Sequence, residues 1–136
     1  MHLKINKASK RWPVPRKGKK FIVSPTHNRE DGIPLLLILR EMLHIVHNRR
    51  EAQLILRSGK IKVNDIIVKN DKRSICLFDL LTFENKKYRL IFNEKGKFSL
   101  DSKEERIAKI IGKKLLSGKR IQIHLQNGNT LIVQEN

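Results

Sequence analysis

Apolar residues recur at helical spacing in a segment before the middle of the chain. This pattern predicts a helix over about residues 33–46, with Asp31 as a candidate N-cap and Pro34 in an early helical position, where its missing N–H costs little. The apolar positions are Leu35, Leu36, Leu39, Met42, Leu43 and Val46. They form one broad face, which predicts burial in a core rather than a ligand site.

A second, shorter helix is predicted to begin after Asn48. Asn48 is a candidate N-cap, and Glu51 stands three residues later, as in a capping box. Gly59 fits the left-handed position that follows a helix end. Arg49 and Arg50 fall in the first turn, where the helix dipole disfavours cations. Two interpretations stay open: the arginines are solvated at a small cost, or they bind a phosphate at the helix start.

Charged and apolar residues then alternate over residues 60–63, which predicts a strand with one basic face. Asn64 and Asp65 tolerate a left-handed backbone and supply the turn, and residues 66–68 predict the returning strand. We expect the apolar residues of the first strand to face inward and its lysines to face outward. Further cations extend this basic rim and are Lys69, Lys72 and Arg73.

The second half of the chain predicts mainly strands. The predicted segments are an apolar stretch over residues 77–83, a strand over 87–92, a turn over 94–97 into residues 98–100, and a hairpin over 121–125 and 130–133 around Asn127-Gly128. Residues 102–116 are expected to form a helix with Ser102 as its cap. Four cations in this half, Lys113, Lys114, Lys119 and Arg120, either touch RNA or belong to a solvated loop.

The first 32 residues show no steady apolar period. Residues 1–30 hold nine Lys and Arg residues, one acid and three prolines. This composition predicts an extended basic arm rather than a packed element; the alternative is a solvated, disordered tail. Trp12 and Phe21 are candidates for stacking on RNA or for packing on the domain.

Composition favours a polyanionic partner. The 136 residues carry 30 Lys and Arg against 13 Asp and Glu, a formal charge of +17. RNA and DNA are the leading candidates, and an anionic membrane surface is the weaker one.

Cys76 is the lone cysteine, so no internal disulfide forms. No apolar run approaches the roughly 20 residues of a membrane span, and residues 1–20 lack a signal-peptide core. We expect a soluble, intracellular protein.

Catalytic motifs are missing from the sequence. It has no Gly-rich phosphate loop and no nucleophile placed near a His and an acid in a known pattern. His44 and His47 have a spacing that suits a metal, but no Cys or carboxylate cluster accompanies them. We expect no enzyme activity, no metal and no cofactor.

Residues 34–73 resemble the RNA-binding domain first described in bacterial ribosomal protein S-four, the alpha-L motif. The residues that carry the resemblance are Arg49, Arg50, Ala52, Gly59, Ile61, Val63, Asn64 and Val68. The chain departs from the family pattern at Asp65, where glycine is usual. Domains of this family bind structured RNA through the helix start and the hairpin.

A wider resemblance, to the archaeal and eukaryotic ribosomal protein family S-four-e (S4e), covers nearly all of the chain in order. It rests on His2-Leu3-Lys4, the basic run to Trp12, residues 33–40, Asp79-Leu80-Leu81, Tyr88-Arg89-Leu90, Gly96-Lys97, Ile121-Gln122-Ile123, Asn127-Gly128 and Leu131-Ile132-Val133. Members usually continue into a KOW-type domain. We expect that domain to be absent here, in a natural short form or a truncated chain.

The resemblance implies an α+β fold with three parts. These are a basic arm (residues 1–32), an alpha-L RNA-binding domain of two helices and a hairpin (33–76), and a small β-rich, barrel-like module (77–136). The implied function is a structural constituent of the small ribosomal subunit, in the cytoplasm. Its partners would be small-subunit rRNA and neighbouring ribosomal proteins, without a membrane or a small-molecule substrate.

Fourteen residues are the predicted RNA contacts. They are Lys10, Arg11, Arg16, Lys17, Lys19, Lys20, Arg49, Arg50, Lys60, Lys62, Asn64, Lys69, Lys72 and Arg73. Phosphate contacts of this kind fix register, so specificity would come mainly from RNA shape. Two alternatives remain: a free-standing factor that binds structured RNA, and the RNA-targeting part of an RNA-modifying enzyme.

Overall fold

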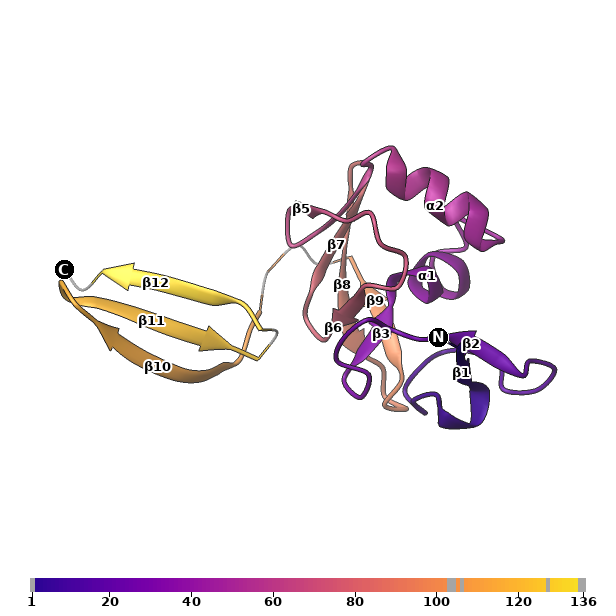
Figure 1. Cartoon of the computed structure of the whole chain (residues 1–136), viewed down its shortest axis with the longest axis horizontal. Coiled ribbons are helices and arrows are strands. Elements are labelled where there is room, and N and C mark those ends of the chain that lie inside the picture. Colours follow the sequence, from indigo (N-terminus) through magenta and orange to yellow (C-terminus); the bar gives the residue numbers. More distant parts are fainter. Residues whose placement is uncertain (1, 103–104, 106, 127, 135–136) are drawn as a thin grey trace. The chain divides into compact units, whose positions relative to one another are not determined.

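The computed structural model describes residues 2–102, 105, 107–126 and 128–134 of the chain, which forms two compact units that divide after residue 105. The first unit contains β1 (His2–Lys4), the 3-10 helix η1 (Ile5–Lys7), β2 (Phe21–Val23), β3 (Gly32–Pro34), α1 (Leu35–Leu37), the π-helical η2 (Ile38–Met42), α2 (Arg49–Arg57), β4 (Ile61–Val63), β5 (Ile66–Ile67), β6 (Ser74–Cys76), β7 (Leu80–Phe83), β8 (Lys86–Phe92) and β9 (Phe98–Asp101). The second contains β10 (Ile110–Leu116), β11 (Arg120–Leu125) and β12 (Thr130–Gln134) (Figure 1). The fold is mixed and rich in strands.

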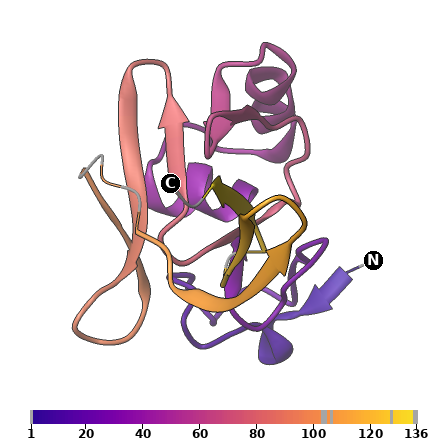
Figure 2. The ribbon, with the colours of Figure 1, turned by 90° about the vertical axis from the view of Figure 1, so that its left-hand side faces the viewer.

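A five-stranded antiparallel sheet organises the first unit. Its strand order is β5-β4-β7-β8-β9, and two short two-stranded sheets, β1-β2 and β3-β6, accompany it. α1 and α2 lie on the same side of this sheet (Figures 1 and 2). Ile61 of β4 pairs with Phe83 of β7. The sheet therefore crosses the division expected at residue 76, and β7–β9 extend the hairpin's sheet instead of starting a barrel.

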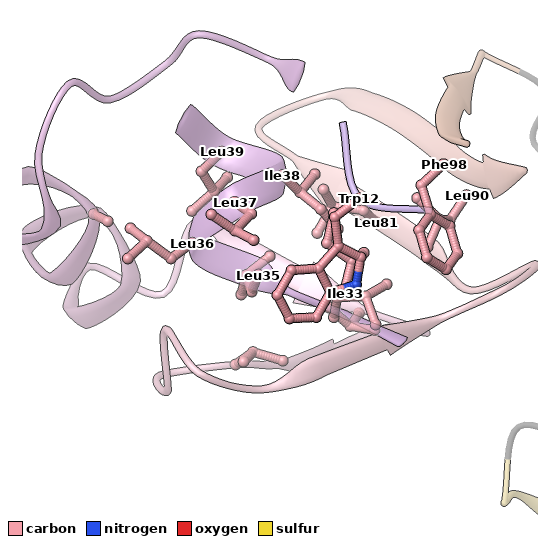
Figure 3. Close-up of a cluster of buried hydrophobic side chains, with 14 of the residues drawn as sticks. Trp12, Ile33, Leu35, Leu36, Leu37, Ile38, Leu39, Leu81, Leu90 and Phe98 are labelled. Carbon is pink, nitrogen blue, oxygen red and sulfur yellow. The ribbon is translucent and has the colours of Figure 1, made fainter. Parts of the chain in front are cut away.

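The core lies between this sheet and α1. Ile61 and Val63 are buried while Lys62 between them is exposed, as the alternating pattern predicts. Figure 3 shows Trp12 in the same cluster as Ile33 and the leucines of α1.

Residues 3–23 pack on this core through several buried side chains, and the prediction of an extended arm was wrong. Trp12 is 2% exposed, and its Nε1 donates to the carbonyl of Gly32 at 2.9 Å. Ile5 is buried too, and the Phe98 N–H donates to the Arg11 carbonyl at 2.8 Å. Ile5, Trp12 and Ile22 are buried against the domain, so the lack of a regular apolar period reflects short, irregular elements rather than disorder.

The first predicted helix begins later and ends earlier than expected. Gly32–Pro34 form a strand that pairs with β6, so Asp31 is not an N-cap. The helix of α1 and η2 covers residues 35–42 only, and His44 follows in a left-handed conformation, with φ of 52°. Carbonyls of the loop before β6 accept hydrogen bonds from the N–H groups of Leu35 and Leu36, both at 2.9 Å, which satisfies donors at the helix start.

The predictions for the second helix and the hairpin are confirmed. α2 follows its N-cap Asn48, ends at Arg57 and is followed by Gly59 with φ of 72°. β4 and β5 pair through a two-residue turn, with Val63 opposite Ile66.

The second unit is a three-stranded antiparallel sheet, β10-β11-β12. The helix predicted over residues 102–116 was wrong, because residues 110–116 form β10 and pair with β11. The β11–β12 hairpin is confirmed, although Asn127 of its predicted turn lies outside the described residues. None of the helices in the described ranges is long and apolar enough to cross a membrane.

Candidate nucleic-acid interface

The start of α2 is held by a network of backbone and side-chain bonds. The Asn48 Oδ1 accepts from the Glu51 N–H at 3.0 Å, and the Glu51 carboxylate reaches back to the N–H of His47 at 2.7 Å. The hydrogen bond from His47 lowers the pKa of Glu51 below its usual range. The network fixes the direction in which the chain enters the helix and therefore the positions of Arg49 and Arg50.

Arg49 is a structural residue. Its Nε and Nη2 donate to the two carboxylate oxygens of Asp71 at 2.6 and 3.2 Å. The Asp71 side chain is 7% exposed and that of Arg49 is 49% exposed, so the pair sits at the edge of the core. The hydrogen bond to Asp71 raises the pKa of Arg49. One of the two interpretations of the sequence placed an anion at this helix start, and the Asp71 carboxylate is an anion of the protein itself that lies there.

Arg50, the second arginine, is exposed, and no hydrogen bond or ion pair of its side chain occurs among the residues that the structure describes. It is therefore the member of the pair that is available to a phosphate.

The hairpin turn is tied to the neighbouring loop through Asn64. Asn64 and Asp65 have φ of 51° and 65°, as a tight two-residue turn requires. The Asn64 Nδ2 donates to Asp79 Oδ1 at 2.8 Å, and its Oδ1 accepts from the Leu80 N–H at 3.0 Å. Asp79 also accepts from the Cys76 N–H at 2.8 Å. Asn64 thus builds the hairpin, and both ends of its amide are already occupied.

Burial, followed by the nearby Asp79 carboxylate, raises the pKa of the Cys76 thiol. The raised pKa keeps this thiol protonated at neutral pH.

Most other cations predicted on the hairpin side are accessible. Lys60, Lys62 and Lys69 are exposed, and Lys72 and Arg73 are partly exposed. Lys60 makes a loose contact with Glu84, at 3.7 Å. Lys62 lies on the outward side of β4, between two buried residues. The other four lie in the loops that precede and follow the hairpin.

The predicted cations of the first 20 residues have varied roles. The Arg16 side chain donates hydrogen bonds to the backbone carbonyls of Ile5, Ala8 and Ser9. These bonds stabilise η1 and the residues that follow it. Arg11 pairs with Asp31 at 3.2 Å, and its guanidinium lies 5.4 Å from the centre of the Phe92 ring.

The remaining four lysines of this segment are exposed. Lys19 pairs with Glu41, and the Lys20 Nζ lies over the Phe21 ring. Lys10 and Lys17 make no side-chain hydrogen bond or ion pair within the described part of the chain.

The fold brings three predicted residues together at one pocket of about 320 Å³. Lys19, Arg49 and Lys72 line it, although they are far apart in the sequence. Arg40 lines the same pocket and was missed. Its only sequence signal is a cation at the end of an apolar helix, which alone does not distinguish a pocket residue from a solvated one.

Within the described ranges, no group of three or more His, Cys, Asp or Glu side chains is placed to hold a metal ion. His44 and His47 both lie in the loop between η2 and α2, and His44 is left-handed, so the two do not share a helix face.

Comparisons with known proteins all indicate one family. Residues 84–136 match the family model described as Ribosomal family S4e. The small ribosomal subunit protein eS4 of Methanocaldococcus jannaschii is 35% identical over 141 aligned residues, which cover 98% of this chain and 58% of that protein. The corresponding protein of Methanocella arvoryzae is 34% identical, over 96% of this chain and 59% of its own length.

A solved structure resembles this fold as well. The crystal structure of the 30S ribosomal protein S4e from Thermoplasma acidophilum superposes with a TM-score of 0.61 at 27% identity, covering 79% of this chain and 58% of that one. The chain spans less than two thirds of the length of these relatives.

Proposed function

We propose that the chain is a member of ribosomal family S4e and a structural constituent of the small ribosomal subunit that binds rRNA in the cytoplasm and has no enzymatic activity. The single observation that carries the proposal is the similarity to small ribosomal subunit proteins eS4 along 98% of the chain. The net charge of +17 supports it, because a polyanion offsets the self-repulsion of so basic a protein.

In this proposal α2 and the β4–β5 hairpin act as an RNA-binding unit of the alpha-L type. Arg50, Lys62 and Lys69 would contact phosphates, since each is exposed; Arg50 belongs to α2, Lys62 to β4 and Lys69 to the loop after β5. Arg49 and Asn64 would hold these elements in place through Asp71 and Asp79. The cations are thereby positioned before binding, which reduces the entropy lost when RNA is bound.

Recognition would depend on shape more than on sequence. Phosphate contacts give affinity and register, but they do not distinguish bases. A rigid set of cations on a helix start, a strand and a loop selects RNA whose phosphates match that spacing.

Charge reversal of Arg50 and Lys62 tests the proposal. The variant Arg50→Glu with Lys62→Glu should remain folded and be lost from small subunits when a cell lysate is sedimented. The matched control, Lys95→Glu with Lys97→Glu on the turn between β8 and β9, changes the charge equally and should sediment with the subunit. Normal incorporation of the folded Arg50 and Lys62 variant would contradict the proposal.

A further inference from the structure

The pocket beside β2 combines an apolar floor with a cationic wall. Phe21 and Val23 of β2 and Leu36 of α1 supply the apolar part. Arg40 of η2, Arg49 of α2 and Lys72 of the loop before β6 supply cations. Its volume of about 320 Å³ lies at the lower end of the range for small-molecule sites, roughly 300–1,000 Å³. The space suits one small planar group with an attached anion.

The pocket keeps a net positive charge. Lys19 and Arg40 both bind the same oxygen of Glu41, at 3.2 and 2.9 Å. Arg49 binds Asp71, so the two carboxylates balance two of the four cations around the pocket. These ion pairs also hold the cations in place, and the excess charge favours an anion.

An exposed aromatic ring lies at this cationic site. Phe21 is 51% exposed although it belongs to a strand, and the Lys20 Nζ lies 5.6 Å from the centre of its ring. A pocket that took phosphate alone would gain nothing from an exposed ring and an apolar floor. Unpaired bases, by contrast, stack on aromatic side chains while their phosphates meet Lys and Arg.

We propose that this pocket binds one unpaired nucleotide that projects from an RNA helix. Its base lies on Phe21 and the apolar floor, and its phosphate lies toward Arg40 and Lys72, while Arg49 keeps its bonds to Asp71. The inference rests on the proposed rRNA-binding function and adds a site to it. With this site, the protein binds an RNA helix that carries an unpaired nucleotide more tightly than a continuous RNA helix.

Binding of two RNA hairpins to the full chain tests this site. One hairpin carries a single unpaired adenosine in its stem, and the other has a continuous stem. The wild-type protein should bind the first about 10-fold more tightly, because stacking of one base contributes roughly 1–3 kcal/mol. Phe21→Leu should remove most of that preference and leave the affinity for the continuous hairpin unchanged. Phe21→Tyr should retain it.

A charge control separates the pocket from the general basic surface. Lys72→Gln should reduce binding of the hairpin with the unpaired adenosine more than Lys97→Gln, a change of equal charge on the β8–β9 turn. Urea unfolding of each variant should match the wild type, which shows that the pocket's frame is kept.

Equal binding of the two hairpins by the wild type would overturn the pocket but leave the proposed RNA-binding function standing. Failure to bind either hairpin would overturn both. Binding of free AMP as tight as that of the RNA, or binding of hexaglutamate that requires Phe21, would overturn the RNA assignment in favour of a small nucleotide or an acidic protein segment.

Discussion

Arg49 donates two hydrogen bonds to the carboxylate of Asp71, from Nε at 2.6 Å and from Nη2 at 3.2 Å. The backbone carbonyl of Asp71 in turn accepts from the N–H of Leu36. One residue of the loop before β6 therefore ties α2 to α1. The two neighbouring arginines divide their roles, since Arg49 stabilises the fold and Arg50 remains exposed.

Replacing Arg49 should destabilise the protein, and replacing Arg50 should not. Arg49→Gln leaves the buried Asp71 carboxylate without its partner, which we expect to lower the free energy of unfolding by about 1–3 kcal/mol, at the lower end for a pair whose arginine is half exposed. Arg50→Gln should change it by less than about 0.5 kcal/mol and weaken RNA binding. Urea denaturation and RNA titration measure the two effects.

A double-mutant cycle with Asp71→Asn checks the cause. If the pair is responsible, the loss in Arg49→Gln with Asp71→Asn should be smaller than the sum of the two single losses. Additive losses would show that Arg49 acts through packing instead.

Local signals were sufficient to predict the second helix and the hairpin. Asn48, Glu51 and Gly59 act within a few residues of the helix ends, and the alternation over residues 60–63 sets the buried face of β4. Such features depend on backbone geometry and neighbouring side chains, so the sequence contains them directly.

Long-range partners decide the parts that were predicted wrongly. Residues 32–34 form a strand because β6, some 40 residues later, offers an edge to pair with. Residues 110–116 are equally compatible with a helix or a strand, and pairing with β11 selects the strand. The same holds for the site: the partners Asp71 and Asp79 have no sequence pattern that connects them to Arg49 and Asn64.

Asn64 should matter for stability even though it makes no RNA contact in our proposal. Asn64→Gly keeps a residue that tolerates the left-handed φ of 51° but removes the bonds to Asp79 and Leu80. We expect a loss of about 1–3 kcal/mol in the free energy of unfolding, because Asp79 is buried. Thermal or urea unfolding measures it.

The neighbouring turn residue provides the control. Asp65→Gly introduces the residue that best tolerates a φ of 65°, and its stability should stay within about 1 kcal/mol of the wild type. If Asn64→Gly were as stable as Asp65→Gly, the tie to Asp79 would not stabilise the turn.

Trp12 should be required for folding of the first unit. Trp12→Ala removes a side chain that is 2% exposed and leaves the Gly32 carbonyl without its donor, so we expect a loss of about 3–5 kcal/mol. Removal of residues 1–20 should therefore destabilise the domain. Calorimetry measures both effects.

Charge changes in the same segment give the matched comparison. Lys10→Gln with Lys17→Gln should leave the unfolding temperature unchanged, because both lysines are exposed. A truncated chain as stable as the wild type would restore the extended arm that the sequence suggested.

Acid should destabilise the protein through two glutamates. Burial alone would raise the pKa of Glu41, but the hydrogen bonds from Lys19 and Arg40 lower it below its ordinary value of 4.5, and the bond from His47 lowers that of Glu51. A group whose pKa is lower in the folded state stabilises the fold above its unfolded pKa and loses that contribution as pH falls through the folded pKa. Stability should therefore decline as pH falls below about 4.5.

Glu51→Gln should be less stable than the wild type at neutral pH and should lose less stability on acidification, because its side chain cannot be protonated. Glu94→Gln, in the exposed turn after β8, should follow the wild-type curve. Parallel curves for Glu51→Gln and the wild type, measured by urea unfolding across this pH range, would show that the bond to His47 contributes nothing that depends on pH.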